Sequence, residues 1–193
     1  MHALLQLSRV IDAINTVIGR AAGWLILAAV VISAINAVVR KIFSNSSNAW
    51  LDAQWHLFGA VFMLCAAYTL LKNGHVRVDL FAASLSKRTR DLIDVFGHIF
   101  FLLPLATLMV YESYPFAMRS LELGEGSSNA GGLPVWPAKM FILAGFILIF
   151  FQAISELIKR IAILLGKIED PDISQDDTPI NEDIAGKTPE TGA

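Results

Sequence analysis

Four stretches of this chain are long enough and apolar enough to cross a lipid bilayer, and this feature constrains the fold more than any other. A hydrocarbon core about 30 Å thick needs about 20 helical residues at 1.5 Å each. Hydrophobic residues make up 55% of the chain and charged residues 17%, which leaves little polar surface for a water-soluble domain. Intervals without a charged residue run over 21–39, 53–71, 95–111 and 140–155.

Prolines mark the third and fourth intervals. Pro104 lies inside the third, where a membrane helix tolerates it as a kink because neighbouring groups satisfy the freed carbonyl. The fourth interval is short, but Pro137 suits the first turn of a helix, and Lys139 can extend its side chain to the interface. The sequence therefore predicts an all-α integral membrane domain over 19–166. Its four transmembrane helices are expected at about 21–39, 53–71, 92–111 and 137–158.

The two ends of the chain differ from this domain. Polar residues Arg9, Asp12 and Asn15 lie between apolar residues at helical spacing, which predicts an N-terminal amphipathic helix over 1–18 along the membrane surface. A cleaved signal peptide is the alternative, but its apolar region would span 7–15 residues, shorter than the interval 21–39. Residues 167–193 are acidic, polar and proline-containing, which predicts a disordered tail. The apolar residues of the amphipathic helix are Leu4, Leu7, Ile11, Ile14 and Ile18.

The distribution of basic residues predicts the orientation, because Lys and Arg in short loops stay on the cytoplasmic side. With both termini inside, eleven basic residues are cytoplasmic and four are external, and the chain has 15 in all. The external four are Arg40, Lys41, Arg119 and Lys139. The cytoplasmic eleven are Arg9, Arg20, Lys72, Arg77, Lys87, Arg88, Arg90, Lys159, Arg160, Lys167 and Lys187.

The middle of each predicted span lacks ionisable residues, whereas a transporter or proton pump that works alone normally has them there. His56 and His98 lie near opposite edges of the membrane, about 20 Å apart along its normal, too far to bind one haem iron. A small multidrug exporter needs a carboxylate in the first span, which has none. Cys65 is the only cysteine, so an internal disulfide or a cysteine-rich metal site is excluded. We therefore expect neither an enzyme nor a cofactor or metal site.

Small residues on the first span indicate helix packing. Gly19 and Gly23 form a small-xxx-small step that continues to Ser33, and such faces let helices approach closely in lipid. Two interpretations stay open, namely packing within this chain's own bundle and packing against a helix of a partner. In either case we expect the chain to work as a component of an assembly.

The segment between the second and third spans carries a distinctive group of charges, His75, Arg77 and Asp79. A basic run follows at Lys87, Arg88 and Arg90, which is placed to contact lipid phosphates. An ordinary solvated loop of the cytoplasmic side is the alternative for that run. The close grouping of the first three residues is not explained by topology alone.

This grouping resembles the small membrane subunit (DctQ-like) of tripartite ATP-independent periplasmic, or TRAP, transporters. The resemblance covers about residues 10–165. It consists of four spans, an acidic residue (Asp52) shortly after a tryptophan (Trp50), and the His-x-Arg-x-Asp motif before a basic stretch. The family more often has Glu at the position of Asp52 and Gly at the position of Cys65.

The resemblance implies a division of labour. A larger membrane subunit would hold the substrate and sodium sites and move as an elevator, and a periplasmic binding protein would deliver an organic acid. This chain would be a scaffold in the bacterial inner membrane, in contact with phospholipids and without a nucleic-acid partner. An accessory or assembly subunit of another inner-membrane complex is the alternative. Candidate contacts with the binding protein are the external residues Glu112, Glu122 and Glu125.

Overall fold

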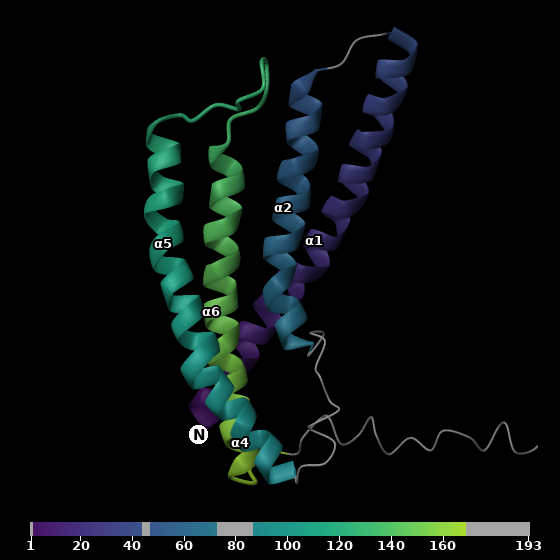
Figure 1. The fold of residues 1–193 in the computed structure, drawn as a ribbon. Helices are drawn as coiled ribbons and strands as arrows, with labels where there is room; N and C mark the ends of the chain where they lie inside the picture. The colour runs from purple at the N-terminus through teal and green to yellow at the C-terminus, as the bar shows by residue number, and fades with distance from the viewer. Residues whose placement is uncertain (1, 44–46, 73–86, 169–193) are drawn as a thin grey trace, which may run out of the picture.

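A computed structural model describes residues 2–43, 47–72 and 87–168, and most of these residues are helical (Figure 1). Helix α1 spans His2–Phe43, and helix α2 spans Asn48–Leu71. Helix α4 (Lys87–Gly97) continues through the π-helix η1 (His98–Leu102) into α5 (Leu103–Glu122). A loop over 123–135 then leads to helix α6 (Trp136–Leu164).

Four helical stretches of the described residues are long and apolar enough to span a membrane. Each predicted span lies inside one of them, and the described residues contain no strand. The predicted all-α membrane fold with four transmembrane helices is therefore confirmed. The four stretches are His2–Phe43, Asn48–Leu71, Asp91–Glu122 and Trp136–Leu164.

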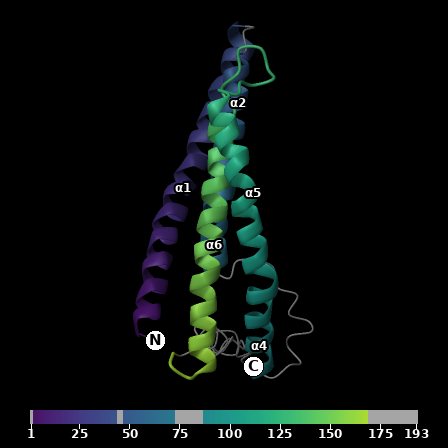
Figure 2. The ribbon, with the colours of Figure 1, turned by 90° about the vertical axis from the view of Figure 1, so that its left-hand side faces the viewer.

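The helices form an open layer instead of a closed bundle. Helix α2 packs between α1 and α6, while α5 packs on α6 (Figure 1). The first half of α1 crosses to the end of α6, so α6 touches α1, α2, α4 and α5. Figure 2 shows α2, α5 and α6 overlapping at one end, as expected for a layer seen from its edge. Helix α6 is accordingly the most buried of the four spanning helices.

Small residues occupy the contacts between helices, and large apolar side chains point outward. Ala29, Ala60 and Ala153 are fully buried, whereas Trp24 and Phe62 are among the most exposed side chains. A Cβ added at Gly145 of α6 would lie 2.8 Å from both the Cβ and the backbone oxygen of Met63 on α2. This arrangement is expected in a bilayer, where helices associate through close approach of their backbones and large apolar side chains face the lipid.

Pro104 lies at the start of α5 directly after the π-helix, and its chemistry explains that wider turn. Proline has no N–H and its ring collides with the carbonyl four residues earlier. The backbone N–H of Leu103 bonds instead to the oxygen of His98, five residues back. The sequence predicted a kink at Pro104, and the structure accommodates the proline with one turn of π-helix.

Helix α1 is continuous, so it joins two segments that the sequence analysis treated separately, residues 1–18 and the first span. Ser8, Ile11 and Asn15 are buried, and Ser8 and Asn15 bond to α6. Leu4 and Leu7, nearer the start of the helix, are about half exposed. The position of residues 1–18 along the membrane surface stays a prediction.

Candidate functional sites at the two ends of the helix layer

At one end of the layer, the first turns of α2 carry three polar residues that hold the loop 123–135. Asn48, Asp52 and His56 follow one another at intervals of four residues, so they share one face of the helix. We call them the loop-binding face of α2. The Asn48 side chain donates a hydrogen bond from Nδ2 to the backbone oxygen of Ala130 at 2.9 Å.

Asp52 is the centre of this face and is 7% exposed. Its Oδ1 accepts a hydrogen bond from Nδ2 of Asn129 at 2.9 Å, and its Oδ2 accepts one from the backbone N–H of Leu133 at 3.0 Å. The Ser127 side chain also donates to this carboxylate. A Cβ on Gly132 would collide with Oδ2 of Asp52 and with Ser127, so the loop fits around the carboxylate only with glycine there.

His56 continues the same face one turn further along α2. Its Nδ1 lies 2.5 Å from the backbone oxygen of Asp52, and its Nε2 lies 3.0 Å from the backbone oxygen of Pro134. The imidazole therefore bridges its own helix and the end of the loop. This bridge explains why an imidazole lies near the helix end, although the sequence did not reveal its partner.

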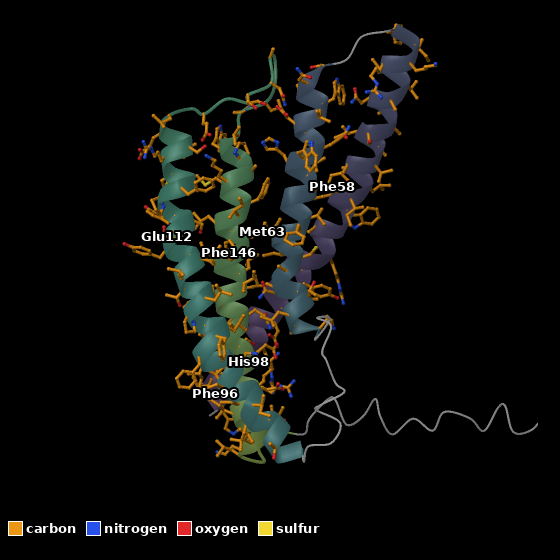
Figure 3. All side chains as sticks on the ribbon, viewed as in Figure 1. Phe58, Met63, Phe96, His98, Glu112 and Phe146 are labelled. Carbon is orange, nitrogen blue, oxygen red and sulfur yellow. The ribbon has the colours of Figure 1, made fainter. Side chains whose placement is uncertain are left out.

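Glu125 fastens the loop to α6 instead. Its Oε2 accepts hydrogen bonds from Nζ of Lys139 at 2.5 Å and from Oγ of Ser120 at 2.6 Å. The Lys139 bond, with a smaller contribution from Ser120, lowers the pKa of the Glu125 carboxyl. Of the three candidate glutamates, Glu112 (labelled on α5 in Figure 3) and Glu122 are exposed, whereas the charge of Glu125 is matched within the chain.

At the opposite end of the layer, a fully buried Gln152 joins α6 to α1. Its Nε2 donates to Oδ1 of Asp12 and to Oε1 of Glu156, both at 2.9 Å, and its Oε1 accepts from Nδ2 of Asn15 at 2.6 Å. Every hydrogen-bonding group of the Gln152 amide has a partner except one acceptor lone pair. The contact pairs polar residues that are about 140 positions apart in the sequence.

Asp12 and Lys159 extend these polar contacts of helix α6. Ser155 donates from Oγ to Oδ1 of Asp12 at 2.7 Å, and Nζ of Lys159 lies 3.1 Å from Oδ2. The same ammonium lies 2.5 Å from Oε1 of Glu156, so two carboxylates share one lysine. Ser8 adds a 2.7 Å bond between its hydroxyl and that of Ser155.

Helix α4 is held on α6 by a second cation. The Arg160 side chain is buried, with Nη1 at 3.8 Å from Oδ1 of Asp91 and Nη2 at 3.7 Å from Oδ2 of Asp94. Nearby, Nδ1 of His98 lies 2.7 Å from the backbone oxygen of Asp94 (Figure 3). Charged residues thus pair across the contact of α6 with α1 and across its contact with α4.

The remaining sequence-predicted residues fall into three groups. Gly19 is packed against Tyr68 of α2, whereas Gly23 and Ser33 are exposed. His75, Arg77 and Asp79 lie outside the described residues, as do the side chains of Lys87, Arg88 and Arg90. Sequence reasoning did not identify the roles of Asn48, His56, Asp12 and Gln152, although the four-residue spacing along α2 was a signal for the first two.

These sites can fix backbone segments to one another. Among residues 2–43, 47–72 and 87–168, no three His, Cys, Asp or Glu side chains gather in a way that would hold a metal ion. The side chains bond to loop backbone at one end and to a neighbouring helix at the other. The fold and its sites define a four-helix integral membrane protein in which polar residues serve assembly.

The chain belongs to the DctQ component family of the tripartite ATP-independent periplasmic transporters, whose family model matches residues 15–162. It is therefore a small permease subunit of a TRAP transporter and a multi-pass inner-membrane protein. Membership also implies partnership with a large membrane subunit and a binding protein. Searches of curated proteins and of solved structures returned no match.

Replacing Asp12 by alanine should destabilise the contact between α1 and α6. The change removes one acceptor from Gln152 and one of two carboxylates from Lys159, which is expected to lower the free energy of unfolding by about 1–3 kcal/mol. Unfolding of the full-length protein in mixed micelles, followed by circular dichroism, measures the change. Arg9→Ala, at an exposed position of the same helix, is the control. Equal losses in the two variants would contradict the assignment.

Acidification should release the Glu125 end of the loop. Because the pKa of Glu125 is lower in the folded protein than its ordinary value of 4.5, its stabilising contribution is present above that value and is lost as the pH falls through the lowered one. Hydrogen exchange of loop amides, corrected for intrinsic rates, should accelerate as the pH falls below this ordinary value of 4.5. Glu125→Gln should remove this acid-induced component, and a variant that keeps it in full would show that another group is responsible.

Proposed function

We propose that this chain is a static scaffold for the large membrane subunit during sodium-driven uptake of an organic acid, which a periplasmic binding protein delivers. The observation that carries the proposal is the distribution of polar side chains. The described polar clusters bind loop backbone or a neighbouring helix, so they supply rigidity and no transport pathway. Sodium and substrate sites would then belong to the partner.

The proposed orientation has both termini in the cytoplasm. The excess of lysine and arginine predicted on that side supports it, since short loops obey this rule. The loop 123–135 and the loop-binding face of α2 would then face the periplasm. Labelling a cysteine placed at position 122 with a membrane-impermeant reagent in intact cells tests this orientation.

The proposed contacts with the large subunit lie on the open side of α1. Gly23 and Ser33 are exposed, and a Cβ on Gly23 would meet no atom of residues 2–43, 47–72 or 87–168 within 4 Å. Small exposed residues on a membrane helix permit close approach of another helix. Gly19 faces Tyr68 and serves the chain's own packing, so the two glycines have different partners in this proposal.

Three further parts of the proposal come from the sequence. His75, Arg77 and Asp79 form a charge-assisted cluster that shapes the cytoplasmic loop. Lys87, Arg88 and Arg90 contact lipid headgroups. Glu122 and Glu112, which are exposed, contact the binding protein, whereas Glu125 is already paired with Lys139.

Reconstitution tests the function as a whole. The chain should copurify with the large subunit, and proteoliposomes that contain this pair and the binding protein should take up an organic acid only with an inward sodium gradient. Omission of the chain should abolish uptake, and Asp79→Asn should reduce copurification. Copurification with a different complex, and full uptake without this chain, would favour an accessory subunit unrelated to transport.

Charge reversal tests the docking part separately. Glu122→Lys should slow uptake at low ionic strength, with a smaller effect in high salt, because exposed charges act mainly on encounter and are screened. Lys167→Glu, an exposed charge at the opposite end of the layer, is the matched control and should leave the rate unchanged. An unaltered rate in Glu122→Lys at low salt would remove this residue from the docking surface.

A further inference from the structure

His56 has an environment that one protonation state alone satisfies. Both ring nitrogens face backbone carbonyl oxygens, that of Asp52 at 2.5 Å from Nδ1 and that of Pro134 at 3.0 Å from Nε2. A carbonyl oxygen only accepts hydrogen bonds. A neutral imidazole has one N–H, whereas an imidazolium has two.

His98 provides an internal comparison. Its Nδ1 also lies close to the carbonyl oxygen four residues earlier, at 2.7 Å, but its buried Nε2 has no hydrogen-bond partner among the residues that the structure describes. A neutral ring with a proton on Nδ1 accounts for the hydrogen bond of His98. The same tautomer of His56 would direct a nitrogen lone pair at the oxygen of Pro134. The second contact of His56 therefore requires a second proton.

Several charged groups lie in this region. Asp52 is one turn earlier than His56 on the same helix, and its carboxylate bonds to the loop. From the loop and from α6, Glu125 and Lys139 pair with each other, so their charges are matched. Glu122 lies at the end of α5 and is exposed. The ring is also accessible to protons, because its bond to Pro134 is at the surface.

We propose that His56 is a proton-dependent latch, which holds the loop 123–135 on α2 when the imidazole carries two protons and releases its last residues when one proton leaves. The doubly protonated ring satisfies both carbonyl oxygens, so it binds the loop more tightly than the neutral ring, and raising the pH enough to remove one proton weakens this contact. The bonds of Asp52 to Asn129 and of Asn48 to Ala130 keep the middle of the loop attached in both states, whereas the bond of Leu133 to Asp52 opens together with the end of the loop. The loop end nearest α6 is the part that loosens.

The latch and the Glu125 contact act at opposite ends of the pH scale. Glu125 loses its charged bond to Lys139 when acid protonates its carboxylate, whereas His56 loses its contact with Pro134 when base removes one of its two ring protons. Loop attachment should therefore be strongest at a pH between these two events. This prediction concerns the chain itself and does not depend on its transported substrate.

Hydrogen exchange of the full-length protein in lipid nanodiscs tests the latch. The reporter amides are those of Leu133 and Val135, whose N–H groups bond to Asp52 and to the backbone oxygen of Glu125. Their protection, corrected for intrinsic rates, should fall about tenfold between pH 5.5 and pH 8.0, as expected for loss of one charge-assisted hydrogen bond. His56→Gln should remove this dependence, and His98→Gln should retain it.

Three outcomes would overturn the proposal: equal protection of the wild-type loop at both pH values, an undiminished pH dependence in His56→Gln, or its loss in His98→Gln. Selective ¹⁵N labelling of histidine provides a second measurement that needs no variant. At pH 5.5, with the loop protected, both nitrogens of His56 should carry protons. A singly protonated His56 ring with a protected loop would equally refute the latch.

Discussion

A polar side chain in a membrane protein must find its hydrogen-bond partners within the protein, because the hydrocarbon core offers no water. Gln152 meets this demand by bonding to Asp12 and Asn15 of α1 and to Glu156 of its own helix. These bonds determine which side of α1 faces α6. The apolar side chains on the other side of α1 are exposed, and this is the side that faces lipid.

In the rest of the layer, too, polar residues bond one segment to another, and large apolar side chains face outward. Between the two ends, α2 and α6 approach closely through Gly145, where a side chain would collide with Met63. At the loop end, the Asp52 carboxylate accepts a hydrogen bond from the backbone N–H of Leu133, a role that water plays for an exposed loop. A layer fastened at both ends and closely packed in the middle suits a part that stays still while a partner moves. That mechanical character is the physical basis of the proposed scaffold.

Hydrophobic length was enough to locate the four spanning helices, because a bilayer demands a minimum run of apolar residues whatever the tertiary fold. Pro104 was recognised as a perturbation, but the π-turn that absorbs it depends on backbone bonding. The periodicity of residues 1–18 indicated a helix, yet not that Asp12 and Asn15 would bond to α6, about 140 residues later. Glu125 was grouped with the external acids, and its pairing with Lys139 distinguishes it from Glu122.

By itself, the sequence determined the class of this protein, its four spanning helices and, through the charge motif and its match to the DctQ family, its place in a TRAP transporter. These properties depend on local composition and on order along the chain. The tertiary structure decided which polar residues meet. Asp52 and His56 bond to the loop 123–135, and Gln152 bonds to α1. No single segment determines these contacts, because they depend on how the helices pack.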